Sequence, residues 1–469
     1  MTAAPSPLEL DLIVRGGQVV TADTVVRADV GIARGRIAAV AAPGLLPRGA
    51  QELDAAGRLV MPGGVDAHTH IRWPYLDQTT RDDFTSATVA AAFGGTTTVI
   101  DYAVQKDAPV DECIARRRAQ ADGHVVVDYA FTCTLTDPSE ENVRSVKRLV
   151  ATGITAFKVY LIYKKRGIMV DDWMLYRVLE ETRDHGAILG IHAENGPIGE
   201  GRMAQFVAEG RKSAWDFRQA KSSFLEAEAI QRAIFLAETL EAPLYIRHIS
   251  TAEGVELLRA ANGRRARIFG ETCPHYFTLT DEVYRRPDGH RFICSPPIKS
   301  ARDRDAVHAA ILDGSMHVVG GDHGAFGEDQ KDERQESFDR VPNGLPGIET
   351  RLPLAYTRGV VEGGMALTRF VQLVSANPAK LFGLYPRKGT IAVGSDADLI
   401  VVDPGKERAV SPERMHLPIG WNPYTGHVLR GFPDLVLSRG DVVVDGDRCL
   451  AKPGRGTYVP GTPGGCSQV

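Results

Sequence analysis

Eight apolar, β-rich runs follow one another along the middle of the chain, and amphipathic stretches lie between them. Such nearly continuous apolar runs are typical of parallel strands that are covered on both faces of a sheet. The eight runs occupy residues 63–70, 96–103, 125–133, 154–161, 187–194, 243–250, 266–273 and 317–323. The clearest amphipathic stretches have helix-capping residues at several of their ends and occupy residues 82–95, 140–153, 171–186 and 226–241. This alternation predicts an α/β fold, a (β/α)8 TIM barrel over residues 62–384, with an open doubly wound sheet as the alternative.

The two ends of the chain have a different pattern. Short alternating runs, broken by Gly and Asp, lie at residues 11–41, 389–405 and 434–450. They predict one small β-sandwich domain of antiparallel strands, built jointly from residues 1–61 and 385–452. Residues 453–469 are rich in Gly and Pro and have no periodicity, so we expect an extended C-terminal tail, ordered only where it packs against the rest of the protein.

Composition narrows the class of protein. Of the 469 residues, 43% are hydrophobic and 24% are charged, as in an ordinary soluble globular protein. The net charge of −4 and the lack of a polybasic run give no reason to expect a nucleic acid or a membrane as partner. The N-terminus has no signal-peptide pattern, and no apolar stretch has the length of a membrane span. Six scattered cysteines without a Cys-x-x-Cys pair indicate reduced thiols and a cytoplasmic protein.

Polar residues near the ends of the predicted strands point to a metal site. His68 and His70 lie two positions apart in the first run, so a strand would place them on one face. Chemistry in a barrel takes place at the carboxyl ends of the strands, where Lys158, His192, His248 and Asp322 also fall. Each of these residues alone is explained as a buried side chain with a backbone partner. An ammonium within the apolar run AFKVYL is costly to desolvate, however, and carbamylation would turn Lys158 into an anion that can bridge two cations. The set therefore predicts a dinuclear metal site.

Several longer motifs extend over nearly the whole chain: VDAHTH, FKVYLIYK, GIHAENG, ETCPHY, CSPPIK, GGDHGAF, NGLPGIETRLPL and NPAKLFGL. With them the chain resembles the cyclic amidohydrolases of the amidohydrolase superfamily, in the hydantoinase/dihydropyrimidinase group. The resemblance implies two divalent ions, usually zinc, with His68 and His70 on one and His192 and His248 on the other. It further implies that N6-carboxylated Lys158 bridges the two ions and that Asp322 contacts the first. A homo-oligomer, a tetramer or a dimer, is expected on the same basis.

The resemblance also implies roles in catalysis and substrate binding. Tyr163 matches the tyrosine that hydrogen-bonds the developing oxyanion, and Asp322 would pass a proton from the attacking hydroxide to the leaving nitrogen. Ser295 and Asn343 match positions that hold the ring amide of the substrate. Alternatively, Tyr163 caps a strand end, and Ser295 and Asn343 only satisfy the backbone of turns. We interpret Cys273 and His275 as structural, with a Cys/His nucleophile pair as the weaker alternative.

Arg72 departs from the usual pattern of the group. The sequence His-x-His-x-Arg is similar to that of dihydroorotases, where the arginine binds the substrate's carboxylate; alternatively, Arg72 pairs with Asp82 or Asp83 in a loop. The predicted function is hydrolysis of a small cyclic ureide, a hydantoin or a dihydropyrimidine, by a metal-bridging hydroxide. A dihydroorotase- or allantoinase-like activity on an anionic ring is the first alternative. A non-catalytic scaffold and a single-metal deaminase, which would not need Lys158, are the others.

Overall fold

The computed structural model describes residues 9–137 and 139–469. Its centre is an eight-stranded sheet in the order β15-β14-β13-β12-β11-β10-β9-β6, and every ladder in it is parallel. Each strand overlaps one of the eight runs predicted from the sequence. The strands are β6 (Gly64–Thr69), β9 (Thr96–Val104), β10 (Asp128–Thr134), β11 (Ala156–Tyr160), β12 (Ile188–His192), β13 (Leu244–Ile246), β14 (Ile268–Thr272) and β15 (Val318–Val319).

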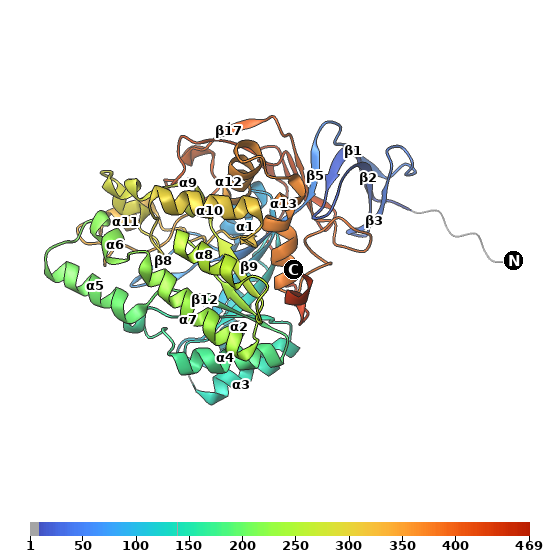
Figure 1. Cartoon of the computed structure of the whole chain (residues 1–469). Coiled ribbons are helices and arrows are strands. Elements are labelled where there is room, and N and C mark those ends of the chain that lie inside the picture. The colour runs from blue at the N-terminus through green and yellow to red at the C-terminus, as the bar shows by residue number, and fades with distance from the viewer. Residues whose placement is uncertain (1–8, 138) are drawn as a thin grey trace.

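The sheet closes on itself after β15. Thr69, at the end of β6, forms a parallel bridge with His323, and the His70 amide donates to the His323 carbonyl oxygen at 2.8 Å. The first and last strands are therefore neighbours, which an open doubly wound sheet would not allow. Figure 1 shows the strands at the centre with helices around them. The predicted (β/α)8 barrel is confirmed.

The helices begin where the sequence offers caps. The Asp83 side chain accepts from the Ser86 amide in a capping box at the start of α1, and the Asp171 side chain accepts from the Met174 amide at the start of α4. All four predicted amphipathic stretches form helices, namely α1, α3, α4 and α7. The α-helices are α1 (Phe84–Phe93), α2 (Val110–Ala121), α3 (Glu140–Ala151), α4 (Asp172–Asp184), α5 (Gly196–Ala208), α6 (Ala214–Ala220), α7 (Phe224–Leu240), α8 (Ala252–Ala261), α9 (Pro274–Thr278), α10 (Ala301–Asp313), α11 (Glu328–Asp332), α12 (Arg351–Ala355), α13 (Leu367–Val371) and α14 (Asn377–Leu381).

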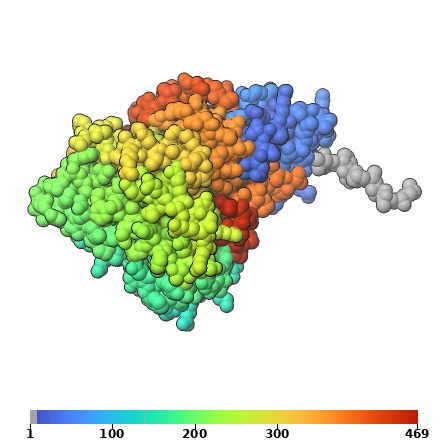
Figure 2. Space-filling view, viewed as in Figure 1, coloured from blue at the N-terminus to red at the C-terminus, as the bar shows by residue number. Residues whose placement is uncertain are grey.

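Both ends of the chain contribute to a second sheet. Its strands are β1 (Leu12–Val20), β2 (Val25–Ala33), β3 (Arg36–Ala41), β4 (Gln51–Asp54), β5 (Leu59–Pro62), β16 (Leu399–Val402), β19 (Leu435–Ser438), β20 (Asp441–Asp445) and β21 (Arg448–Cys449). Strand β5 pairs with β16 and so joins the two ends of the chain. Strands from both ends contribute to one buried hydrophobic cluster, which includes Val14, Val60, Leu399 and Leu437. Figure 2 shows the N-terminal surface in blue beside orange segments from the C-terminal part. The small β domain built from both termini is confirmed.

One detail of this sheet differs from the expectation. Strand β1 pairs in parallel with β4 and with β5, so the sheet is mixed, whereas the sequence pattern indicated antiparallel strands only. The chain leaves β3, crosses over and returns beside β1 in the same direction, which alternation within each strand cannot reveal. Two small pairs complete the strands: β7 (Pro74–Tyr75) with β8 (Gln78–Thr79), and β17 (Glu407–Ala409) with β18 (Val428–Arg430).

The C-terminal tail lies along the amino ends of the barrel strands. The Val459 amide donates to the Tyr129 carbonyl oxygen at 2.8 Å, and the Gly461 amide donates to that of Gly153 at 2.8 Å. Gly153 has a φ of +92°, and a Cβ there would lie 2.4 Å from the Cβ of Pro460, so the close approach requires glycine. Backbone partners on the barrel thus order a segment that has no periodicity. None of the helices in residues 9–137 and 139–469 combines the length and apolar character needed to cross a bilayer.

Candidate active site

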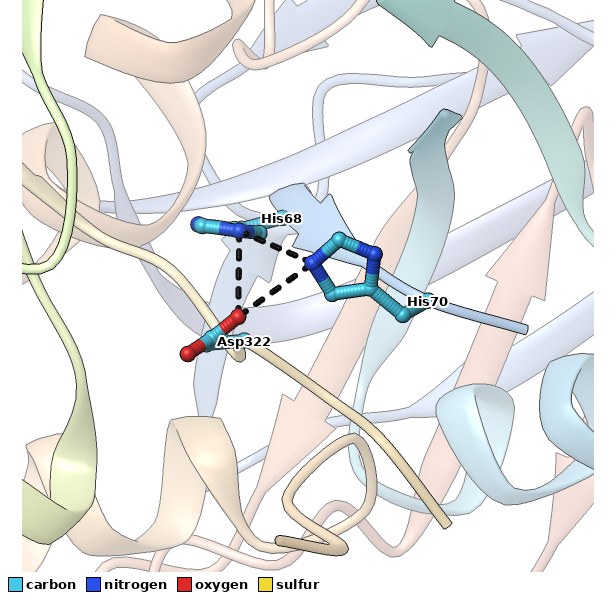
Figure 3. A group of neighbouring side chains, drawn as sticks. All are labelled: His68, His70 and Asp322. Atoms are coloured by element: carbon cyan, nitrogen blue, oxygen red, sulfur yellow. Dashed lines mark hydrogen bonds and ion pairs between the residues drawn. The ribbon is translucent and has the colours of Figure 1, made fainter. Parts of the chain in front are cut away.

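Three of the predicted metal ligands meet at the carboxyl end of the barrel. His68 and His70 come from the end of β6, and Asp322 follows β15. The Nε2 atoms of His68 and His70 lie 3.2 Å apart. Asp322 Oδ1 lies 3.1 Å from His68 Nε2 and 3.4 Å from His70 Nε2. Figure 3 shows the three side chains converging on one point. Two imidazole nitrogens and a carboxylate oxygen are the donors that a divalent cation such as Zn²⁺ takes.

The other three predicted ligands lie beside this group. Lys158 is on β11, His192 ends β12 and His248 follows β13. His192 Nδ1 lies 3.0 Å from His248 Nε2, and Lys158 Nζ lies 3.3 Å from His68 Nε2. The rings of His68 and His248 have centroids 5.5 Å apart, so the two groups adjoin. The structure therefore brings all six side chains together.

Two buried glutamates determine which nitrogen of a histidine carries the proton. Glu271 Oε1 lies 2.5 Å from His68 Nδ1, and Glu194 Oε2 lies 2.7 Å from His192 Nε2. Burial would raise the pKa of Glu194, but the Lys221 ammonium holds that pKa below its usual range, and an ionised carboxylate only accepts hydrogen bonds, so the His192 N–H is on Nε2. An ionised Glu271 would place the His68 N–H on Nδ1 in the same way. The lone pairs of His68 Nε2 and His192 Nδ1 then face the other ligands, as they do when histidine binds a metal.

Burial keeps these imidazoles neutral. It lowers the pKa of His68 and of His248 well below the ordinary value and that of His70 to about 4. Burial alone would raise the pKa of Asp322, but the histidines around it hold that pKa well below its usual range. Neutral imidazoles and an ionised carboxylate suit a divalent cation, so the residues present fit the metal centre that the resemblance implies.

Lys158 is a buried lysine for which the cost of burying the charge outweighs the attraction of the nearby carboxylates. Burial, and then the nearby Arg247 guanidinium, lower the pKa of Lys158 to about 7. A large share of the side chain is therefore a neutral amine at neutral pH. Only a neutral amine can add CO2, so this lysine meets the first requirement for carbamylation.

The predicted substrate-binding residues Tyr163, Ser295 and Asn343 line a cavity beside the predicted metal ligands. The same cavity is lined by His70, Lys158, His192, His248 and Asp322. Arg72 is not among the lining residues: its side chain is exposed, and its backbone amide donates to Asp82 Oδ1 at 3.2 Å. The alternation that aligns His68 with His70 ends with β6 at Thr69, and Arg72 lies in a turn with a φ of +47°. Strand periodicity therefore cannot place Arg72 in the site.

Sequence analysis missed the ion pairs behind the ligands. Lys221 Nζ lies 2.8 Å from Glu194 Oε2 and also donates to Ser295 Oγ, so it connects a partner of His192 with a cavity-lining residue. The spacing His192-x-Glu194 could have revealed Glu194, because alternate residues along an extended segment share a face. Nothing in the sequence near His68 indicates Glu271, which comes from another strand, β14.

The backbone at the site is strained in several places. Tyr163, His248 and Asp322 have φ values of +76°, +42° and +45°, in the left-handed region that non-glycine residues rarely adopt. Each such residue costs on the order of 1–3 kcal/mol, and such strain clusters at functional sites. Three such residues in one cavity support its choice as the candidate site.

Known proteins share this architecture. The profile of the amidohydrolase family matches residues 59–443. A D-hydantoinase from Ralstonia pickettii is 38% identical over 454 residues, which cover 96% of this chain and 98% of the relative. A D-hydantoinase from Rhizobium radiobacter is 37% identical over 453 residues, 96% of this chain and 98% of the relative. The crystal structure of dihydropyrimidinase from Brevibacillus agri superposes with a TM-score of 0.94 at 35% identity and covers 96% of this chain and 98% of that one. These matches confirm the resemblance found in the sequence: the chain belongs to the amidohydrolase family and is a cyclic amidohydrolase of the hydantoinase/dihydropyrimidinase group.

Proposed function

We propose that the protein opens hydantoins, dihydropyrimidines or related cyclic ureides by binuclear metal-dependent hydrolysis. One observation carries the proposal: two groups of histidine side chains adjoin at a buried lysine, with ring nitrogens 3.2 Å apart in one group and 3.0 Å apart in the other. His68, His70 and Asp322 would hold one ion, His192 and His248 would hold the other, and N6-carboxylated Lys158 would bridge the two. Two divalent ions, zinc in our proposal, would supply hydroxide as the nucleophile at neutral pH by lowering the pKa of a shared water.

The chain's own residues would bind the ring and move the proton. Burial raises the pKa of Tyr163 above its ordinary value, so the hydroxyl stays protonated and can donate to a developing oxyanion. Asp322 would take the proton of the nucleophile and deliver it to the leaving ring nitrogen. Ser295 and Asn343, on the cavity wall, would hold the ring amide.

The alternatives find less support. Arg72 is exposed outside the cavity lining, so it gives no reason to prefer an anionic ring. All six metal-ligating positions keep their donor side chains, which a scaffold would not need. A homo-oligomer remains a prediction, as does a cytoplasmic location, which the six free cysteines favour.

A substrate panel with metal analysis tests the proposal. We expect the purified protein, loaded with Zn²⁺ in the presence of bicarbonate, to bind about two ions per chain. It should open unsubstituted hydantoin or dihydrouracil, monitored by the loss of ring absorbance. Turnover of dihydroorotate or allantoin alone would support the first alternative instead, and a protein that binds no stoichiometric metal would support the scaffold.

Replacing Tyr163 with phenylalanine tests the oxyanion donor. We expect Tyr163→Phe to lower kcat about 100- to 1,000-fold, because one such donor contributes on that scale. Metal content should stay at the wild-type level, since the side chain is not a proposed ligand. If kcat instead falls less than about threefold, Tyr163 only caps the strand end and the oxyanion has another donor.

Replacing Glu194 with glutamine tests the orientation of His192. Glu194→Gln removes the charge that holds the His192 N–H in place and leaves Lys221 without its carboxylate. We expect metal affinity, measured by competition with a chromophoric chelator, to fall about 10- to 100-fold. The control is Glu209→Gln, on the exposed end of α5, which should bind metal as the wild type does. Unchanged affinity in Glu194→Gln would show that packing alone orients the imidazole.

A further inference from the structure

Arg166 places a guanidinium in the wall of the catalytic cavity. It ends the short helix η1 (Lys164–Arg166), which follows directly after Tyr163. The Arg166 amide donates to the Tyr163 carbonyl oxygen at 3.0 Å, so one tight turn carries both side chains. Arg166 is half-buried and lines the cavity together with Tyr163, Ser295 and Asn343.

Two aromatic rings hold the guanidinium in position. Its Cζ lies 4.3 Å from the centroid of the Tyr75 ring and 5.0 Å from that of the Tyr163 ring. Cation–π contacts of this kind fix the group without using its hydrogen-bond donors. The side chain is thus pre-organised, which reduces the entropy that binding a ligand would cost.

Arg166 forms no ion pair within the part of the chain that the structure describes. Among residues 9–137 and 139–469, no carboxylate oxygen lies within 4.0 Å of its nitrogens, although the half-buried Arg177 and Arg291 are both paired. Asp137 and Glu141 line a neighbouring depression that Arg166 also borders, but neither forms an ion pair with it. Lys164 and Lys165 beside it are exposed and add to the positive charge at this side of the cavity.

We propose that Arg166 binds a carboxylate carried on the side chain of a cyclic ureide, so that the enzyme prefers rings with an anionic substituent. The inference rests on the proposed function and specifies its substrate class. A planar guanidinium with free donors matches a carboxylate in two parallel hydrogen bonds. Trp73 and Phe326 also line the cavity and offer apolar surface to a short methylene spacer between ring and carboxylate. In this proposal Arg166, rather than Arg72, binds the substrate's carboxylate.

A matched pair of substrates tests the proposal. Hydantoin with a 2-carboxyethyl group at ring carbon 5 and its 2-carbamoylethyl analogue have nearly the same shape but differ in charge. We expect the wild type to open the acid with the higher kcat/KM. Arg166→Gln should lower the acid-to-amide ratio of kcat/KM about 10- to 100-fold. Arg166→Lys should lower this ratio less, because lysine keeps the positive charge but lacks the two parallel donors of the guanidinium.

Lys165→Gln is the control, because it removes one positive charge from the same turn at an exposed position. Its ratio should stay near that of the wild type. A wild-type ratio of one or below overturns the proposal without any variant. An acid-to-amide ratio that Arg166→Gln leaves unchanged also overturns it. The same holds if Lys165→Gln lowers the ratio as much as Arg166→Gln does, because the preference would then come from the general positive charge of the turn. Failure of the proposed function is separate: the metal-loaded wild type would then open neither unsubstituted hydantoin nor dihydrouracil.

Discussion

Lys158→Ala is expected to abolish the two-metal centre and to lower kcat/KM about 1,000-fold or more. The side chain is fully buried beside His68, and no other anion in the proposed ligand set would bridge the two ions. A metal centre contributes several kcal/mol of transition-state stabilisation, and each 1.4 kcal/mol corresponds to about tenfold in rate. Metal content should fall below about two ions per chain, as measured by mass spectrometry of the desalted protein.

A second buried lysine provides the control. Burial lowers the pKa of Lys331 to about 7, as it does for Lys158, but Lys331 Nζ donates to the Ile293 carbonyl oxygen at 2.9 Å. Lys331→Met should therefore keep both metal ions. Millimolar acetate should restore part of the activity of Lys158→Ala, by placing a carboxylate in the vacated space, but not that of Lys158→Met, whose side chain fills it. Two bound ions and near-normal activity in Lys158→Ala would contradict the bridge and favour single-metal chemistry.

The parts of the site that sequence could predict are those that local geometry determines. Buried parallel strands leave continuous apolar runs, so all eight barrel strands could be located. His68 and His70 share a face because they lie within one strand, and barrel closure then places the other strand ends around them. Lys158 stood out because an ammonium within an apolar run requires an explanation.

The parts that could not be predicted depend on contacts between distant segments. Glu271 fixes His68 across 203 positions of sequence, and no local pattern records that pairing. Arg72 and Arg166 both follow a barrel strand closely, but only the turn after Tyr163 brings its arginine into the cavity wall. Loop conformation decides between the two, and a residue such as Tyr163, with a φ of +76°, gives no sign of its conformation in the sequence.

Lys388 also forms contacts between segments that are distant in the sequence, and these contacts connect three parts of the molecule. Its Nζ lies 2.6 Å from Asp128 Oδ2, 2.7 Å from Asp398 Oδ2 and 3.0 Å from Asp396 Oδ2, and all four side chains are buried. Asp128 begins barrel strand β10, whereas Asp396 and Asp398 precede β16 of the small sheet. The Thr457 amide of the tail donates to Asp128 Oδ1 at 2.9 Å. One ammonium thus lies where the barrel, the small domain and the tail meet.

Replacing Lys388 with methionine should destabilise the protein by about 3–5 kcal/mol, because the change keeps the stem but leaves buried carboxylates without their shared cation. Burial would lower the pKa of Lys388, but the three carboxylates raise it above the ordinary value. Because the pKa is raised in the folded state, the contribution of the Lys388 charge to the free energy of unfolding is complete below the unfolded pKa of about 10.4. It is lost only as pH rises through the folded pKa, so urea unfolding at pH 7 measures it in full. The control is Lys406→Met, whose exposed pair with Asp434 at 2.6 Å should contribute about 0–1 kcal/mol. Equal shifts of the unfolding midpoint in the two variants would show that Arg387 and Arg439, which also contact these carboxylates, compensate the charge without Lys388.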